Sequence, residues 1–299
     1  MPPVPYTGCI FSEERSVTYL IGPCLAVLAL LATAAQAQAP ADLSELSQGT
    51  HIHGLAFDPQ DEDRILIATH HGLFAFDLEA EELAPVGESR QDFMGFSVDP
   101  SGVFYGSGHP ETGGNSGVIT SSDGGVTWTP LSDGVGGPVD FHQLTVSLAD
   151  PAILYGSYRG DIQHSHDAGV TWQLVGPAPE GLIDLAGSAL DPDILYAATA
   201  SGLLKSEDNG LTWAPAHPAS LPVTFVESGS GGTLYAFLQG LGLMRADEDS
   251  LDWTLVSEPM GGEYILHFAT DGTRAVAATG SGMILVSGTG GKDWRVLGD

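Results

Sequence analysis

The sequence predicts an all-β fold, a six-bladed β-propeller with four antiparallel strands in each blade. Five tryptophans recur at a nearly constant spacing of 44, 41, 40 and 41 residues: Trp128, Trp172, Trp213, Trp253 and Trp294. A period of about 40 residues is typical of repeat architectures. The chain of 299 residues leaves room for six such units after its N-terminal segment. Units of four short strands close into a propeller.

Each unit contains short apolar runs separated by turn residues, and no segment shows a sustained helical period. The first runs are expected to be the innermost strands and cover 51–58, 92–99, 140–147, 184–191, 223–228 and 264–271. The second runs cover 65–69, 103–107, 153–157, 194–199, 233–238 and 275–279. The last strand, 294–297, is expected to pair within its own blade, and residues 42–49 to add an edge strand where the ring closes.

Three of the tryptophans end the same pattern, S-x-D-x-G-x-T-W, at 121–128, 165–172 and 206–213. Diverged copies stand at 246–253, which lacks the Ser, Gly and Thr, and at 287–294, which keeps the Ser, Gly and Trp. We expect the Asp to bond its own backbone, the Gly to take a positive φ and the Trp to pack between blades.

This pattern resembles the Asp-box, or bacterial neuraminidase repeat. That repeat occurs in sialidases and related glycosyl hydrolase-like proteins, in sortilin-type receptors and in photosystem assembly factors. The resemblance implies a propeller in which each box forms the turn between the third and fourth strands. It also implies that this turn lies on the face away from the active site, so His164 and His166 are expected to be structural.

The charge balance is strongly acidic, with 9 Lys and Arg against 38 Asp and Glu and a formal net charge of −29. Such a surface repels nucleic acid and anionic lipid, so neither is expected as a partner. It attracts cations, which makes a metal ion or a small ligand the more plausible partner; a protein partner is left open.

The N-terminus has the pattern of a secretory signal peptide. Residues 17–31 form an apolar core, and 32–39 supply the small residues of a cleavage site. The apolar run is shorter than the ~20 residues that a membrane span needs. We therefore predict cleavage near Ala37 and a periplasmic or secreted protein that has no membrane contact after cleavage.

The predicted organisation has three parts: a signal peptide at 1–37, an N-terminal linker at 38–50 and the propeller at 51–299. Both cysteines, Cys9 and Cys24, belong to the first part. The mature protein is therefore expected to have no thiol and no disulfide.

Histidines and acids gather where the first strands begin. The first strands were aligned at Gly54, Gly95, Gln143 and Gly187. One resulting set of equivalent residues is His53, Met94, His142 and Ala186. The set two residues earlier is His51, Asp92, Asp140 and Asp184. Residues i and i+2 of a strand share a face, so both sets are predicted to face the central channel.

The loops after the second strands point to the same end of the channel. Aligned at Thr69, Ser107, Ser157 and Thr199, they carry His70 and His71 in the first unit and His109 in the second. Imidazole is the commonest metal ligand, and a thioether beside it suits copper. The predicted copper or zinc ligands are His51, His53, Met94, His109 and His142, with His70 and His71 as alternatives.

Other interpretations remain open at this point. The same histidines would also suit a water-filled channel. His217, in a loop, and His267, whose place in the first strand of the sixth unit puts it on the opposite face, are expected to be structural. If the protein is an enzyme, the resemblance implies a glycoside hydrolase, with Asp92, Asp140 and Asp184 as the candidate catalytic acids. A sialidase is disfavoured, because Arg159 is the only arginine placed clearly at the mouth and three would be needed.

A scaffold or assembly role is the third interpretation. The resembling photosystem factors use a basic surface patch, and this chain is acidic. From the sequence we favour an exported propeller without catalytic activity that binds a transition metal at a His-rich channel mouth.

Overall fold

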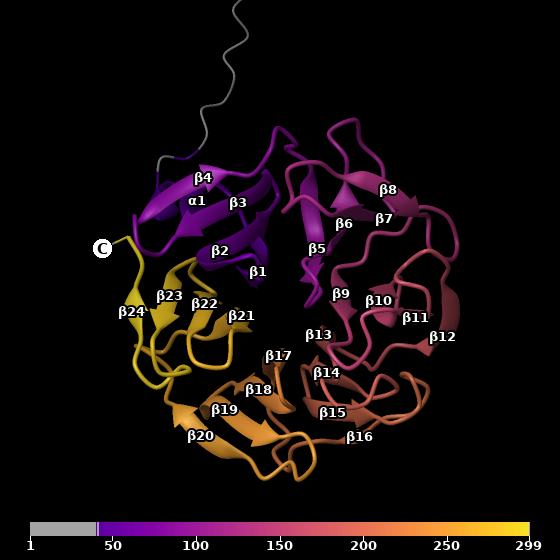
Figure 1. Cartoon of the computed structure of the whole chain (residues 1–299). Coiled ribbons are helices and arrows are strands. Elements are labelled where there is room, and N and C mark those ends of the chain that lie inside the picture. Colours follow the sequence, from indigo (N-terminus) through magenta and orange to yellow (C-terminus); the bar gives the residue numbers. More distant parts are fainter. Residues whose placement is uncertain (1–39, 41, 299) are drawn as a thin grey trace, which may run out of the picture. The chain divides into compact units, whose positions relative to one another are not determined.

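The computed structural model describes residue 40 and residues 42–298. Within this part of the chain, six four-stranded antiparallel sheets are arranged as blades around a central channel (Figure 1). Blade one consists of β1–β4, blade two of β5–β8, and so on to blade six, β21–β24. The predicted six-bladed propeller is confirmed. The predicted signal peptide and both cysteines lie outside the described residues.

In each blade the strands follow the chain order from the channel to the rim. The innermost strands are β1 (Ile52–Asp58), β5 (Asp92–Val98), β9 (Gln143–Val146), β13 (Leu182–Gly187), β17 (Val223–Gly229) and β21 (Ile265–Thr270). The second strands are β2 (Asp61–Thr69), β6 (Phe104–His109), β10 (Leu154–Tyr158), β14 (Leu195–Thr199), β18 (Thr233–Leu238) and β22 (Ala275–Thr279).

The outer half of each blade is a hairpin. The third strands are β3 (Gly72–Asp77), β7 (Val118–Ser121), β11 (Asp161–Ser165), β15 (Gly202–Ser206), β19 (Gly242–Asp247) and β23 (Ile284–Ser287). The rim strands are β4 (Glu82–Pro85), β8 (Thr129–Ser132), β12 (Gln173–Pro177), β16 (Ala214–Pro215), β20 (Thr254–Ser257) and β24 (Arg295–Val296). The core lies between blades, because the second and third strands are apolar on both faces and each face packs against a neighbouring sheet.

The Asp-box closes the turn between the third and fourth strands, as predicted. In blade three, Ser165 Oγ donates to Asp167 Oδ1 (2.9 Å) and accepts from the N–H of Gly169 (2.9 Å). The N–H and hydroxyl of Thr171 both donate to the Asp167 carboxylate, at 2.8 and 2.7 Å. Gly169 has φ 84°, and its carbonyl accepts from Trp172 Nε1 (3.0 Å). The box is thus a self-contained turn that anchors a tryptophan.

The copy in blade six keeps this turn by exchanging two residues. Thr289 stands where the three intact boxes have Asp, and Asp293 stands where they have Thr. The hydroxyl of Thr289 donates to Asp293, and the N–H of Gly291 donates to Ser287 Oγ (2.9 Å). The same hydrogen bond is made with donor and acceptor exchanged, so this copy is less diverged than the sequence pattern indicated.

Residues 42–49 do not form the predicted edge strand. They include a short helix, α1 (Leu43–Gly49), whose N-cap Asp42 accepts from the N–H of Glu45 (2.8 Å). Leu43 and Leu46 are buried in the core cluster between blades one and six. Their spacing of three residues puts both on one face of a helix, which a strand would not do. The strand prediction is therefore wrong.

The ring closes by packing of blade six against blade one, as expected, since β24 pairs with β23 of its own blade. Arg274 of blade six donates to Asp63 Oδ1 of blade one (3.1 Å), and its guanidinium lies 5.2 Å from the ring centroid of Phe57. These contacts and the core shared by the two blades replace a strand exchanged between the chain ends.

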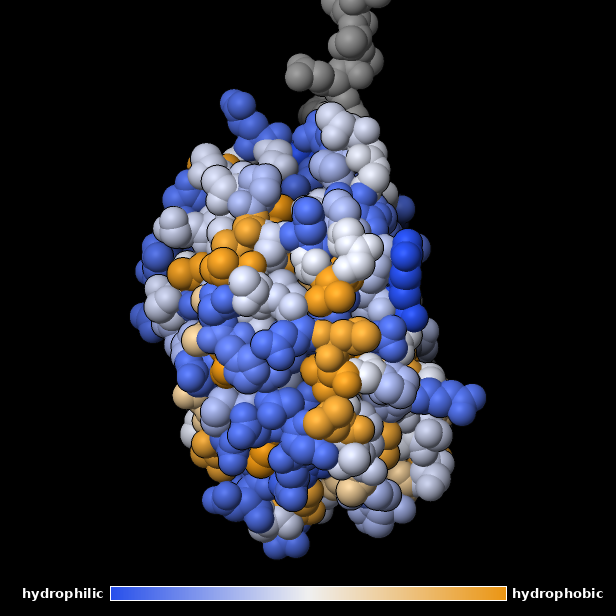
Figure 2. Space-filling model, turned by 90° about the vertical axis from the view of Figure 1, so that its right-hand side faces the viewer, coloured by the Kyte–Doolittle hydropathy of each residue, from blue (hydrophilic) through white to orange (hydrophobic). Residues whose placement is uncertain are grey.

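The outer surface is mainly polar. Figure 2 shows one side of the molecule, where hydrophilic residues surround a band of hydrophobic ones. Exposed aliphatic side chains on the Asp-box turns include Val126, Val170 and Leu211. Among the described residues, none of the helices has the length and apolarity to cross a membrane.

Candidate metal centre

The mouth of the channel, defined as the end where the first strands begin, brings three histidines of blade one together. His51 precedes β1, His53 lies in it, and His70 follows β2. Ile52 pairs with Thr69, so the beginning of β1 and the end of β2 lie at the same end of the blade. A β-bulge between Ile52 and Gly54 places His53 at the extra position, and bulges commonly redirect side chains near functional sites.

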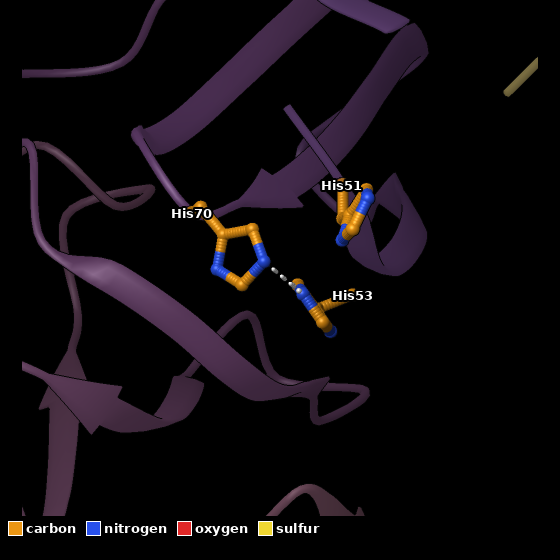
Figure 3. Close-up of side chains that lie close together, drawn as sticks. All are labelled: His51, His53 and His70. Carbon is orange, nitrogen blue, oxygen red and sulfur yellow. Dashed lines mark hydrogen bonds between the residues drawn. The ribbon is translucent and has the colours of Figure 1, made fainter. Parts of the chain in front are cut away.

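These three histidines, called here the His triad, form a compact cluster (Figure 3). One ligand nitrogen from each of His51, His53 and His70 lies within 4.8 Å of the others. The Nε2 atoms of His53 and His70 are 3.1 Å apart. Nitrogens bound to zinc at ~2.0–2.1 Å in a tetrahedral site are separated by about 3.3 Å. The His53 and His70 pair therefore has nearly the spacing that a tetrahedral ion requires, and a ligand nitrogen of His51 lies within 4.8 Å of both.

Asp92 of blade two determines the tautomer of His70. Its Oδ1 lies 2.6 Å from His70 Nδ1, so that nitrogen carries the proton and donates it. His70 Nε2 is then left with its lone pair directed at His53. A carboxylate that holds the far nitrogen of a ligating imidazole is the usual support of a metal-bound histidine. Burial, and then the neighbouring His70, lower the pKa of His53 to about 3, so this imidazole is neutral near pH 7.

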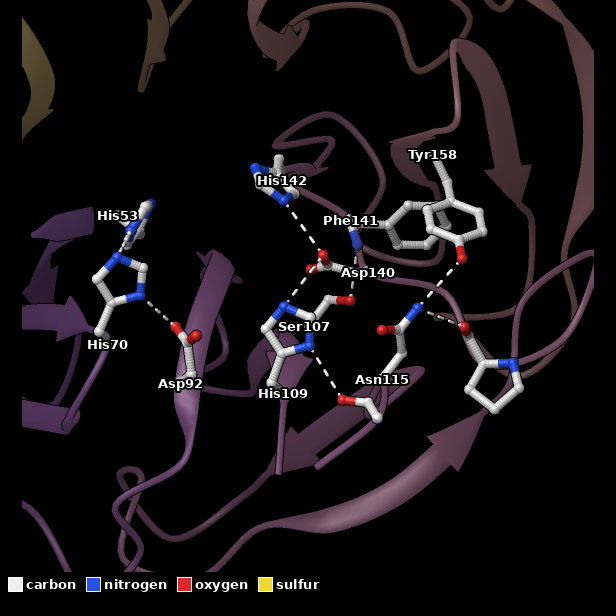
Figure 4. Close-up of polar contacts among 12 residues, drawn as sticks. His53, His70, Asp92, Ser107, His109, Asn115, Asp140, Phe141, His142 and Tyr158 are labelled. Carbon is white, nitrogen blue, oxygen red and sulfur yellow. Dashed lines mark hydrogen bonds and ion pairs between the residues drawn. The ribbon is translucent and has the colours of Figure 1, made fainter. Parts of the chain in front are cut away.

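A second polar network lies at the junction of blades two and three (Figure 4). Asp140 Oδ2 is 3.1 Å from His142 Nε2 and 3.4 Å from His109 Nε2. His109 Nδ1 is 3.0 Å from the carbonyl oxygen of Gly114 and donates to it. The other oxygen of Asp140, Oδ1, is buried and has no partner among the described residues. His109, Asp140 and His142 are called here the His–Asp network.

The strand register shows which residues are equivalent between blades. In five blades the same position of the second strand pairs with a residue of the first strand, so the paired first-strand residues are equivalent. These residues are Gly54, Gly95, Gln143, Asp184 and His267. The predicted equivalence of His53, Met94 and His142 is confirmed. In blade four the alignment at Gly187 is wrong, because Asp184 takes that position three residues earlier.

The loops after the second strands also need a correction of one residue. The register makes Ser107 equivalent to Ala68 and not to Thr69. His109 is then the counterpart of His70. The contacts His70 to Asp92 and His109 to Asp140 are therefore one contact, repeated at two successive blade junctions. The alignment by residue spacing did not pair His109 with His70, because β6 extends to His109 while β2 ends before His70.

The predicted ligands thus divide into separate groups. His51, His53 and His70 come together, whereas His109 and His142 belong to the His–Asp network. His71 is exposed, and Met94 is buried beside the channel. Of the described His, Cys, Asp and Glu residues, only the His triad forms a group of three with ligand atoms this close.

The channel itself contains a cavity of about 780 Å³, lined by first strands of all six blades. Its deeper part holds Asp184 and Glu227, which sequence reasoning did not pair. Burial raises the pKa of Asp184 to about 7, although its oxygens accept from the N–H groups of Val226 (3.0 Å) and Leu185 (2.9 Å). Burial, and then Asp184, raise the pKa of Glu227 to about 8.

His267 lines this cavity too, contrary to its predicted place on the opposite face of its strand. A bulge between Ile265 and His267 shifts the alternation of β21 by one residue, which a period of two cannot reveal. Burial lowers the pKa of His267 to about 4. On the Asp-box side, His164 is buried and stacks on Tyr155, with ring centroids 4.6 Å apart, as its structural assignment requires.

Comparison with known proteins identifies the fold. No protein-family model matches the chain, and no curated protein sequence matches it. Among solved structures, it is similar to a GH74 xyloglucanase from Xanthomonas campestris (TM-score 0.55, 20% identity) and to a GH74 enzyme from Niastella koreensis (0.59, 16%). Each match covers 83% of this chain and 45% of the other, so the chain spans less than half of their length.

The structure of YCF48 bound to a D1 peptide is similar as well (TM-score 0.52, 17% identity), with 83% of this chain and 81% of that one covered. At these identities the likeness concerns the fold. The chain has the propeller architecture that glycoside hydrolases and YCF48 also use, in agreement with the Asp-box resemblance.

Proposed function

We propose that this protein is an exported propeller that binds zinc or copper on the His triad at the mouth of its channel. The observation that carries the proposal is the spacing of the three imidazoles, with His53 and His70 Nε2 3.1 Å apart. Asp92 supports it by leaving His70 Nε2 free to ligate. A formal charge of −29 adds a field that concentrates cations.

The metal-free protein needs one proton between the two Nε2 atoms, since two bare lone pairs at this distance repel. His53 provides it by carrying its proton on Nε2. To bind an ion through Nε2, His53 would carry this proton on Nδ1 instead. Met94 lines the same cavity, and its thioether would favour copper over zinc.

Calorimetric titration of the purified protein with ZnCl₂ and CuCl₂ tests the proposal. Replacing His53 and His70 together by Ala should abolish tight binding. Asp92→Asn should weaken it by about 10–100-fold, because it removes the group that orients a ligand. His71→Ala is the matched control, as His71 is exposed and adjacent to His70 in the chain. Equal affinity of the wild type and the His53/His70 variant would refute the proposal.

Export is proposed from the N-terminal pattern alone. N-terminal sequencing of the protein from its native host should return a chain beginning near Gln38. A sequence that begins at Met1 would contradict it.

Glycoside hydrolysis inside the channel is a second candidate function. Asp92 and Asp140, two of the acids predicted for it, are each bonded to an imidazole at the mouth. Asp184 and Glu227 suit it better, because burial raises the pKa of both carboxyls and Asp184 raises that of Glu227 further, so that one can stay protonated as the acid while the other is ionised. Release of reducing ends from xyloglucan, lost in Asp184→Asn, would favour this function; no release by the wild type would exclude that substrate.

A further inference from the structure

The mouth has two walls that carry chemically different histidines. The His triad stands on blade one, and His142 stands on blade three beside the start of β9. His53 and His142 line the same cavity (Figure 4). The side chain of His142 is 52% exposed, so a molecule in the mouth can reach it.

His142 is held at one nitrogen and free at the other. Its Nε2 donates to Asp140 Oδ2 at 3.1 Å. Its Nδ1 makes no hydrogen bond to any other described residue. Asp140 Oδ2 also lies 3.4 Å from His109 Nε2, and His109 Nδ1 donates to the Gly114 carbonyl. A carboxylate that orients an imidazole in this manner leaves the second nitrogen available for proton transfer.

We infer that the mouth is a hydrolytic site for small uncharged esters, in which His142 protonates the departing alcohol oxygen. The nucleophile would be water activated by an ion that the His triad holds on blade one. The inference therefore rests on the proposed metal binding by the His triad, and it adds an activity and a substrate class to that site.

The step balances as follows. The water oxygen forms a bond to the ester carbonyl carbon, and the π electrons move to the carbonyl oxygen. When this adduct collapses, the bond from the acyl carbon to the alkoxy oxygen breaks. That oxygen keeps the electron pair and takes the proton from His142 Nδ1. The attacking water gives up one proton to the solvent and His142 regains one from the solvent, so the products are a carboxylic acid and an alcohol with no net change in protons.

Charge selects an uncharged substrate. Arg274 is the only Arg or Lys among the residues lining the cavity, and it is engaged by Asp271 (2.7 Å) and Asp63 (3.1 Å) at the far end. An anionic ester would be repelled by the acidic surface of the protein, which has a formal net charge of −29, before it reached the mouth. A cavity of about 780 Å³ is of the size that small-molecule sites have.

The ionisation of His142 agrees with an acid role. Its hydrogen bond to Asp140 outweighs partial burial and raises the pKa of His142, so the proton to be donated is retained nearer to neutral pH. The titratable groups around it that bear on this are Asp140, Asp92 and His53.

Two ester substrates distinguish the contribution of His142 as a general acid from the contribution of the metal ion. Benzyl acetate releases an alkoxide that needs a proton, whereas p-nitrophenyl acetate releases a stable phenolate that does not. With zinc-loaded protein, His142→Gln should lower kcat/KM for benzyl acetate by about 10²–10⁴-fold, the usual contribution of a general acid. It should leave p-nitrophenyl acetate hydrolysis and zinc affinity unchanged. His53→Ala should lose both activities with the metal, and His71→Gln should change none of the three.

The outcomes are distinct. If the wild type binds neither zinc nor copper, or binds them without the triad, the proposed function fails and this inference fails with it. If only copper binds to the triad, the proposed function stands and this inference fails. If zinc binds to the triad and neither ester is hydrolysed above free zinc, only this inference fails. If His142→Gln slows both esters equally, the general-acid role is wrong.

Asp140 is a positioning residue in this scheme, and a pH profile distinguishes that role from a structural one. Activity towards benzyl acetate should fall as the pH rises through the pKa of His142. In Asp140→Asn this fall should occur at lower pH, because the bond that raises the pKa is weakened. An unchanged profile would refute the positioning role.

Discussion

Replacing Glu227 by Gln should stabilise the protein at alkaline pH and hardly affect it in acid. The carboxyl lines the channel beside Asp184, and burial and that neighbour raise its pKa from an ordinary 4.5 to about 8. The folded protein therefore holds a proton that the unfolded chain has released between these two pH values. For such a group, stability is fully present below the unfolded pKa and is lost as the pH rises to the folded pKa.

The size of the effect follows from the shift. A change of 3.5 pH units, from 4.5 to 8, corresponds to about 5 kcal/mol if nothing screens the charge. Glu227 is only partly shielded from solvent, which screens the ionised group, so we expect a loss of about 1–3 kcal/mol. Gln has the shape of the protonated acid and cannot ionise, so the variant should escape this loss.

The assay is unfolding in urea at pH 4, 6 and 9, monitored by tryptophan fluorescence. The variant should match the wild type at pH 4 and exceed it by about 1–3 kcal/mol at pH 9. Glu180→Gln is the control, because Glu180 is exposed and its substitution should change little at any pH. If Glu227→Gln is no more stable than the wild type at pH 9, Glu227 is not a buried acid with a raised pKa.

Two further predictions concern the Asp-boxes. Trp172→Ala should cost about 3–5 kcal/mol in the same assay, because the side chain is 9% exposed and packs against Phe141 at a centroid distance of 4.9 Å; a loss below about 1 kcal/mol would show that it is not wedged between blades. In blade six, Thr289→Asp and Asp293→Thr should each lower the melting temperature, since one pairs two acids and the other two hydroxyls. The double variant should restore the temperature by recreating the pattern of the other boxes, and failure to do so would mean that the exchanged hydrogen bond is not equivalent.

The sequence by itself determined the fold, because the same pattern of turn-forming residues recurs in several units. Ser, Asp, Gly and Thr at fixed places in each box make a turn whose bonds all lie within eight residues, as in 165–172. Such short-range contacts can be predicted without knowledge of the neighbouring blade. The Trp that ends the box then sets the period and the number of blades.

Residues at the mouth were also predicted to gather there, since the ends of antiparallel strands coincide. Which of them meet was decided by tertiary structure. A bulge of one residue shifts every side chain beyond it, and bulges displace His53 in β1 and His267 against its predicted face in β21. Neither bulge can be predicted from the spacing of residues in the sequence.

The same holds for the grouping of the predicted ligands. His70 and His109 are equivalent residues with equivalent Asp partners in the next blade, yet His70 uses Nδ1 for this contact and His109 uses Nε2. The contact through Nδ1 leaves His70 Nε2 facing His53, whereas His109 belongs to the next blade and faces Asp140. Side-chain rotation depends on what the adjacent blade presents, and that is known only when the blades are packed.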